Sequence, residues 1–209
     1  MNDNFTKEFF QTAWGKAGYQ EDIKYGVGMD KICQVCLTPF FNSTKTALEI
    51  GCGGGSFTKR IVGNFKHLTA IDVIAPPPQF ASFKNFSFYE LPNQNTTCSG
   101  VPDSSIDFVW CYNVFCHLSD DMIASYLKGA HRVLKPGGDF VFMLSNFEKV
   151  RSYNPDPSKV YQRGEKMPLG HYMQDETTLG TVSRWYDWDV INPNMLPDHR
   201  DIVIHLRKK

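Results

Sequence analysis

The sequence has no excess of charge of either sign and no long apolar run. Its 209 residues include 22 lysines and arginines against 22 aspartates and glutamates, so the formal net charge at pH 7 is +0. Such a chain lacks the basic surplus that a long nucleic-acid footprint or an anionic membrane would require. No apolar stretch approaches the roughly 18 residues of a membrane-spanning helix. These absences favour a soluble protein that acts on a small molecule.

Signal-peptide and zinc-site patterns are also missing. The N-terminal segment, MNDNFTKEFFQTAW, has neither a basic stretch nor an apolar core, so it does not resemble a signal peptide. The six cysteines include one CxxC pair, Cys33 and Cys36, which no second CxxC or HxxxH follows. A tetrahedral zinc site needs such a second pair. We therefore expect reduced thiols on an apolar helix face with Ile32 and Phe40, no metal site and a cytoplasmic location.

The length and composition fit one folded domain. Charged residues make up 21% and aromatic residues 14% of the chain, which is typical of a globular protein and not of a disordered one. A chain of this length has about the size of one domain. Since we find no internal repeat and no linker, we expect residues 1–209 to form a single domain.

Apolar runs alternate with helical patterns through the middle of the chain. We expect strands at residues 46–50, 67–74, 86–91, 105–112 and 139–145, helices at 28–40, 56–64, 119–133 and 177–186, and extended segments at 188–193 and 201–207. Ser119 is expected to cap its helix, and Lys135–Gly138 to form a turn. Strands that alternate with helices predict an α/β fold with a doubly wound, parallel sheet.

Glycines are concentrated directly after the first expected strand, in ALEIGCGGGSFTKRI. The pattern from Glu49 to Gly55 is acidic-x-G-x-G-x-G. Glycine lets the backbone turn sharply and approach a ligand without a Cβ collision, and ligands of such sheets lie beyond the carboxyl ends of the strands. The dinucleotide pattern GxGxxG would need glycine where Ser56 stands. Asp72, about 20 residues further on, supplies the acidic partner of a nucleoside site.

Several segments, in order, resemble the motifs of class I S-adenosylmethionine-dependent methyltransferases. LEIGCGGG resembles the first motif, AIDVI the second, GVPDSSIDFVWCYNVFCHLS the end of the fourth strand, and HRVLKPGGDFVF the passage into the fifth. RDIVIHLRKK suits the antiparallel last strand of many members. The resemblance covers about residues 45–145 and the C-terminal tail. It implies a Rossmann-like sheet of seven strands, mostly parallel, S-adenosyl-L-methionine as cofactor and S-adenosyl-L-homocysteine as product.

The resemblance also implies which residues meet the cofactor. They are Glu49, Gly51, Cys52, Gly53, Gly55, Asp72, Val73, Asn93, Gln94, Asn95, Cys111, Tyr112 and Asn113. The glycine loop would contact the amino-acid end, and Asp72 would accept both ribose hydroxyls, since a carboxylate offers two acceptor oxygens. Many members place an aspartate near the adenine amino group. This chain has the amides of residues 93–95 there, and which of them substitutes stays open.

The reaction that the resemblance implies is an in-line displacement, which depends mainly on alignment. A general base is needed only if the acceptor is protonated at neutral pH. His117 and His171 are the candidate bases, although His117 also suits a structural hydrogen bond before a helix. Tyr112 and Asn113 follow the fourth strand, where methyl group and acceptor usually meet, but Tyr112 would equally suit packing on the sheet.

Two segments without a decodable motif are expected to determine the acceptor. Residues 1–30, with Trp14, Tyr19 and Tyr25, would form an N-terminal lid or anchor that segment to the core. Residues 147–175 are rich in proline and tyrosine and too long for an ordinary connection, so we expect them to cover the substrate. The segment GVPDSSIDFVW resembles the corresponding segment of bacterial methyltransferases associated with sugars and surface polysaccharides, which suggests a sugar-related acceptor.

Three other functions stay open at this point. A nicotinamide-dependent oxidoreductase has a similar sheet, but Ser56 argues against it. Aminopropyl transfer would normally require a pocket with paired acids, which we do not find in the sequence. A non-catalytic subunit with a methyltransferase fold would keep the glycine loop and Asp72 while lacking an acceptor site.

Overall fold

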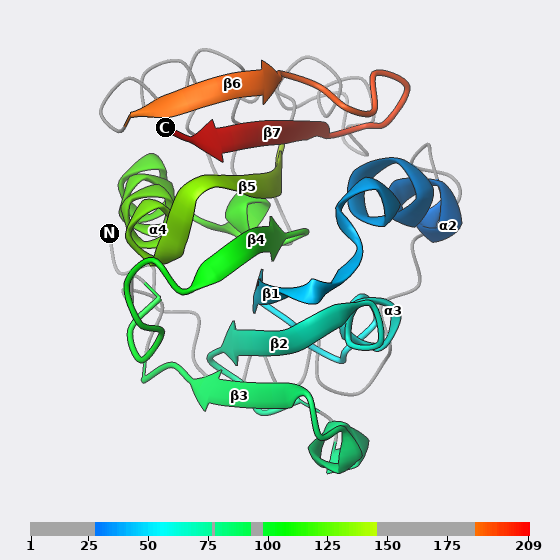
Figure 1. The fold of residues 1–209 in the computed structure, drawn as a ribbon. Helices are drawn as coiled ribbons and strands as arrows, with labels where there is room; N and C mark the ends of the chain where they lie inside the picture. Colours follow the sequence, from blue (N-terminus) through cyan, green and yellow to red (C-terminus); the bar gives the residue numbers. More distant parts are fainter. Residues whose placement is uncertain (1–27, 77, 93–97, 146–186) are drawn as a thin grey trace.

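The computed structural model describes residues 28–76, 78–92, 98–145 and 187–209, and a seven-stranded sheet forms its centre (Figure 1). The strands are β1 (Asn42–Ile50), β2 (Phe65–Asp72), β3 (Phe86–Glu90), β4 (Ile106–Cys111), β5 (Leu134–Leu144), β6 (Trp188–Asn192) and β7 (Ile202–Lys208). Their order is β3-β2-β1-β4-β5-β7-β6. Pairing is parallel from β3 across to β5, whereas β7 runs antiparallel to both of its neighbours. The predicted Rossmann-like, mostly parallel sheet with an antiparallel last strand is therefore confirmed.

The helix expected at 119–133 is confirmed as a regular α-helix, whereas the other helical segments are shorter or less regular than the sequence pattern indicates. The helical segments are α2 (Met29–Ile32), η2 (Cys33–Leu37), η3 (Thr38–Phe40), α3 (Thr58–Ile61), η4 (Pro78–Ser82), η5 (Phe115–His117) and α4 (Asp120–Val133). The helix expected at 28–40 is helical throughout but changes from α to π to 3-10 geometry, and the helix expected at 56–64 keeps one short α segment.

Ser119 occupies the N-cap position of α4, but its side chain makes no capping hydrogen bond. The prediction of a side-chain cap was therefore wrong. The backbone carbonyl of Ser119 accepts the Ile123 N–H at 3.0 Å and begins the helix. Asp120 and Asp121 lie in the first turn, as expected, where the helix dipole favours negative charge.

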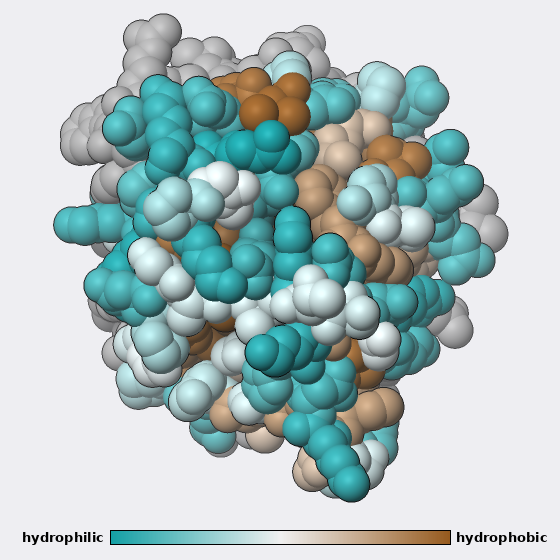
Figure 2. Space-filling model, in the orientation of Figure 1, coloured by the Kyte–Doolittle hydropathy of each residue, from teal (hydrophilic) through white to brown (hydrophobic). Residues whose placement is uncertain are grey.

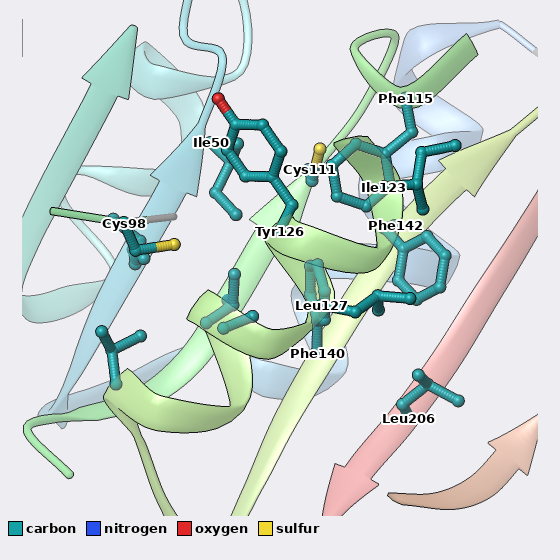
Figure 3. Packing of buried hydrophobic residues seen from close by; sticks show 14 of the residues in the cluster. Ile50, Cys98, Cys111, Phe115, Ile123, Tyr126, Leu127, Phe140, Phe142 and Leu206 are labelled. Atoms are coloured by element: carbon teal, nitrogen blue, oxygen red, sulfur yellow. The ribbon is translucent and has the colours of Figure 1, made fainter. Parts of the chain in front are cut away.

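Hydrophobic layers cover both faces of the sheet. Alternate residues of β4 point to opposite faces, so Val109 contributes to a cluster beneath α4, and Trp110 to a cluster beneath α2 and α3. Figure 1 shows α4 on one side of the sheet and α2 with α3 on the other. In the first cluster, Leu127 of α4 packs near Phe140 of β5, and both are fully buried (Figure 3).

The expected turn at Lys135–Gly138 does not precede the fifth strand, because these residues belong to β5 itself. Pairing between β4 and β5 shifts from Ile106↔Leu134 to Phe108↔Asp139, so the extra residues form an irregularity within the ladder. Gly137 has φ of +75°, a left-handed conformation that glycine adopts without strain. The Lys135 ammonium donates to the Asp107 carboxylate at 2.8 Å and fastens this irregularity to β4.

Several expectations fall on residues that the structure does not describe. They are the N-terminal lid apart from residues 28–30, the amides Asn93, Gln94 and Asn95, the substrate-covering segment 147–175 with His171, and the helix expected at 177–186. Within the described ranges, no helix has the length and apolarity to cross a bilayer. On the face in Figure 2, hydrophilic side chains predominate and apolar ones form smaller areas.

Candidate functional site

A cavity lies at the carboxyl ends of β1, β2 and β4. Beside β1 the sheet changes the direction in which successive strands are added, because β2 and β3 lie on one side of β1 and β4 and β5 lie on the other. This is the position at which open α/β sheets bind ligands. Its described lining is Glu49, Ile50, Gly51, Cys52, Gly53, Gly54, Ser56, Phe57, Ile71, Asp72, Val73, Ile74, Leu91, Tyr112, Asn113, Val114, His117, Leu118 and Tyr126. Motifs that are distant in the sequence therefore meet in one place.

The alternating glycines of the loop share a left-handed backbone but differ in the space around them. Gly51, Gly53 and Gly55 all have positive φ, at +75°, +47° and +80°. A Cβ on Gly51 would lie 2.1 Å from Val114, and one on Gly55 would lie 2.2 Å from the Phe80 ring. A Cβ on Gly53 would meet no described atom within 4 Å. Packing thus excludes side chains at Gly51 and Gly55, whereas Gly53 leaves open space in the cavity wall.

Asp72 ties the glycine loop to the end of β2. Its Oδ2 accepts the Gly53 N–H at 2.7 Å, and its Oδ1 accepts the Ile74 N–H at 3.2 Å. Burial raises the pKa of Asp72 above its ordinary value, although these backbone donors oppose the shift. Each carboxylate oxygen has two lone pairs, so Asp72 can accept further hydrogen bonds from a ligand.

Glu49 is the second carboxylate of the cavity and is 2% exposed. Its Oε2 accepts the Thr58 hydroxyl at 2.6 Å. Burial raises the pKa of Glu49 to about 7, and the charge of Asp72 adds to this rise, while the Thr58 hydrogen bond opposes it. No lysine or arginine belongs to the described lining. The cavity is therefore suited to a ligand that carries positive charge.

Tyr112 lines the cavity at the end of β4 and also packs on the sheet, so both of its expected roles are compatible with the structure. Its ring stacks on Trp110 at 5.5 Å between centroids. Its Oη lies 3.0 Å from Nε2 of His199, and Nδ1 of His199 accepts the Asp201 N–H at 3.0 Å. Because Nδ1 is an acceptor, Nε2 of neutral His199 carries the proton and donates to Tyr112.

Other predicted residues divide between the cavity and its surroundings. Asn113 and His117 line the cavity, and Asn113 has φ of +58°, which is uncommon outside glycine. Cys111 and Gly55 are not among the described lining residues. The Cys111 side chain lies in the core beneath α4 (Figure 3), because it alternates with Tyr112 along β4. The three amides at 93–95 and His171 lie outside the described residues.

One cavity residue, Tyr126, and one partner of a cavity residue, His199, carried no sequence signal. Tyr126 belongs to α4, where its spacing from Ile123 predicts only a core position, yet it lines the cavity and is 5% exposed. His199 lies between β6 and β7 and reaches Tyr112 only through the antiparallel pairing of β7 with β5. Among the described residues, no group of three histidine, cysteine or acidic side chains is placed to hold a metal ion.

Comparison with known sequences finds similarity to methyltransferases. Residues 48–142 match the family described as methyltransferase domain. A ubiquinone biosynthesis O-methyltransferase of Hahella chejuensis is 29% identical over 106 residues, which are 49% of this chain and 44% of the relative. The N-terminal Xaa-Pro-Lys N-methyltransferase 1 of Rattus norvegicus is 31% identical over 110 residues, 49% of this chain and 48% of the relative. The matches thus span less than half the length of these curated relatives.

Solved structures share the fold at low identity. The N-methyltransferase NodS of Bradyrhizobium japonicum, in complex with S-adenosylhomocysteine, has a TM-score of 0.59 at 18% identity and covers 86% of this chain and 84% of its own. The [4+2]-cyclase SpnF has a TM-score of 0.60 at 14% identity, over 86% and 78% of the two chains. The fold alone therefore does not determine the reaction. The family match over residues 48–142, which is less than half of the chain, agrees with the resemblance read from the motifs, and the solved structures share the fold of the chain.

Proposed function

We propose that the chain binds S-adenosylmethionine in this cavity and transfers its methyl group to a small-molecule acceptor. The observation that carries the proposal is the meeting of the glycine loop with Glu49 and Asp72 in a cavity whose described lining has no basic side chain. S-adenosylmethionine brings an ammonium and a sulfonium. A nicotinamide dinucleotide would bring an anionic pyrophosphate toward these carboxylates, so the same observation argues against an oxidoreductase.

Each part of the cofactor has a chemically suited partner. Asp72 has the acceptor capacity for the ribose hydroxyls. Val73, Ile74 and Leu91 offer apolar surface to the adenine ring. Glu49 and the open space beside Gly53 suit the amino-acid end. We assign Cys111 no contact with the cofactor, because its side chain is fully buried in the core.

The chain's contribution to the reaction would be alignment. The cofactor supplies an activated methyl group, and holding donor and acceptor in line can lower a barrier by about 7–11 kcal/mol. Tyr112 and Asn113, at the end of β4, are placed to orient the acceptor. His117 lines the same cavity and would take a proton from an acceptor that is protonated at neutral pH.

The acceptor is the least constrained part of the proposal. The relatives' names point to different acceptors, since one is a tRNA N(3)-methylcytidine methyltransferase and another acts in ubiquinone biosynthesis. The zero net charge favours a small molecule over RNA. A sugar-related acceptor is the finer form of the proposal. All six cysteines are free thiols, which supports a reducing compartment such as the cytoplasm.

A methyl-transfer assay tests the proposal. The purified chain is incubated with S-adenosylmethionine labelled in its methyl group and with a panel of nucleotide sugars, phenols, amines and tRNA. We expect label to enter a small molecule, and a sugar most of all. Label in tRNA alone would overturn the small-molecule acceptor. Cofactor binding without transfer to any member of a broad panel would favour a non-catalytic binding subunit.

A further inference from the structure

We propose that His199 is a positioning residue for the methyl acceptor, and that it acts by holding the Tyr112 hydroxyl as a hydrogen-bond donor at the cavity wall. This inference rests on the proposed function, because it concerns the acceptor end of the same cavity. It gives a role in the reaction to the connection between β6 and β7, which lies outside the matched segment at residues 48–142.

The ring of Tyr112 is held rigidly at the cavity. It stacks on Trp110 with 10° between the ring planes, and the Phe57 ring lies 5.0 Å from it between centroids. Tyr112 is buried, yet it belongs to the cavity lining. A ring packed in this way keeps its rotamer, so β4 determines where the hydroxyl oxygen lies, and the direction of the O–H bond depends on the partners of that oxygen.

The direction of the hydrogen bond between His199 and Tyr112 follows from the other nitrogen of the imidazole. Nδ1 of His199 accepts the Asp201 N–H at 3.0 Å, so neutral His199 carries its proton on Nε2. Nε2 lies 3.0 Å from the Tyr112 Oη and therefore donates to it. Because His199 is the donor, Tyr112 turns its own proton away from His199 and can donate it to a molecule in the cavity.

Hydrogen bonds within the connection between β6 and β7 keep His199 in this place. The Asn194 Oδ1 accepts the Leu196 N–H at 3.2 Å, and the Leu196 carbonyl accepts the His199 N–H at 3.0 Å. The Met195 N–H donates to the Val203 carbonyl at 2.7 Å and ties the connection to β7. Leu196 and His199 are both buried. The position of the imidazole is therefore determined by the backbone of its own connection.

A hydrogen-bond donor in a fixed place restricts how the acceptor can lie. Tyr112 donates to an oxygen or nitrogen lone pair of the acceptor, while another lone pair attacks the methyl group. An in-line displacement depends on this alignment, and a misplacement of about 1 Å can cost about 100-fold in rate. His199 keeps its proton throughout, and neither His199 nor Tyr112 forms or breaks a covalent bond.

Two substitutions separate the positioning of the acceptor from the support of the connection. In His199→Gln, the amide nitrogen takes the place of Nε2 and can donate to Tyr112. In His199→Asn, the shorter side chain offers an oxygen near the place of Nδ1 for the Asp201 N–H, but its amide does not reach Tyr112. We expect His199→Asn to lower kcat about 10- to 100-fold, and His199→Gln to retain most of the wild-type rate.

Initial rates are measured with S-adenosylmethionine labelled in its methyl group and the panel compound that takes up most label. Tyr112→Phe removes the oxygen to which His199 donates, so His199→Asn should cause no further loss in that background. Affinity for S-adenosylhomocysteine in the His199 variants should stay close to the wild-type value. His67→Asn is the matched control, because His67 contacts Ser87 and lies outside the described lining.

Nitrogen NMR tests the direction of the hydrogen bond without an acceptor. Long-range proton–nitrogen spectra distinguish the two tautomers of a neutral imidazole, and signals that disappear in a folded His199 variant belong to His199. We expect the Nε2–H tautomer, with a changed Nε2 shift in Tyr112→Phe. Unfolding temperatures show which variants are folded. If His199→Asn is not, the His199→Gln rate and the NMR result decide.

The outcomes separate the inference from the function. A wild-type rate in His199→Asn, equal losses in His199→Asn and His199→Gln, independent losses in the double variant, or the Nδ1–H tautomer would overturn the role of His199 and leave the proposed function in place. Failure of the wild type to bind S-adenosylhomocysteine, or to label any compound of the panel, would overturn the proposed function itself.

Discussion

At the scale of single residues, Asp72 has a structural and a ligand-binding role at once. Its carboxylate holds the Gly53 amide at 2.7 Å, so it fixes the glycine loop before any ligand is present. It also faces the cavity, where a ribose would lie under the proposed function. A substitution that removes the charge but keeps a hydrogen-bond acceptor therefore separates the two roles better than truncation does.

Asp72→Asn is expected to weaken binding of S-adenosylhomocysteine by about 1.5–3 kcal/mol, because hydrogen bonds to a charged acceptor are lost. Asp72→Ala should weaken it further, since the Gly53 amide then loses its partner as well. Calorimetry measures both affinities. Asp189→Asn on β6, outside the described lining, is the control. Wild-type affinity in Asp72→Asn would exclude this carboxylate from the binding site.

The glycines allow a second residue-scale prediction. Gly51→Ala should destabilise the fold by about 2–4 kcal/mol, because its Cβ would collide with Val114 and the left-handed backbone is strained in alanine. Gly53→Ala should cost only about 1–2 kcal/mol of stability, yet reduce cofactor affinity strongly, because no described atom lies within 4 Å of its methyl group, which would occupy space in the cavity. Urea unfolding and calorimetry separate these effects. Equal losses of stability in both variants would contradict the assignment.

At the scale of elements, strands were easier to predict than helices. Each expected strand overlaps an observed one, because a buried parallel strand is a short apolar run bounded by turn residues. The turn predicted at Lys135–Gly138 was wrong. Its proline and glycines are typical of a turn, but the pairing of β5 with β4 includes this segment in β5. The site was predictable where it follows a strand, as at Asp72. His199 was not, because only strand pairing brings it to Tyr112.

The pairing of β5 with β7 includes an ionic cluster that should make stability depend on pH. Burial alone would raise the pKa of Asp139, but hydrogen bonds from His205 at 2.7 Å and Arg207 at 2.9 Å more than offset this, so the pKa is lowered. The cluster therefore stabilises the fold above the ordinary pKa of aspartate, and this contribution is lost as the pH falls through the lowered value.

Asp139→Asn should accordingly lower the free energy of unfolding by roughly 3 kcal/mol at pH 7, because His205 and Arg207 lose their charged partner. The difference from the wild type should stay constant down to about pH 4 and shrink below it. Urea unfolding at several pH values measures both. A difference that does not change down to pH 2.5 would show that the charge of Asp139 is not what stabilises the pair of strands.

At the scale of the whole molecule, the residues of the candidate site lie together at one edge of the sheet. The glycine loop, Asp72 and the residues after β4 all follow parallel strands whose carboxyl ends meet there, while β7 brings His199 to the same edge. The family match over residues 48–142 covers this half of the molecule. Under the proposed function, specificity for the acceptor would come from residues 1–30 and 147–175, so cofactor binding and acceptor choice are separable.

The central claim is that the cavity binds an S-adenosyl compound in preference to a dinucleotide, and a calorimetric titration of the full chain tests it most directly. S-adenosylhomocysteine and NAD are titrated separately into the same preparation at pH 8, where Glu49 is ionised above its pKa of about 7. We predict saturable binding of one S-adenosylhomocysteine per chain and much weaker binding of NAD, whose pyrophosphate would face Glu49 and Asp72. Tighter binding of NAD than of S-adenosylhomocysteine would contradict the account.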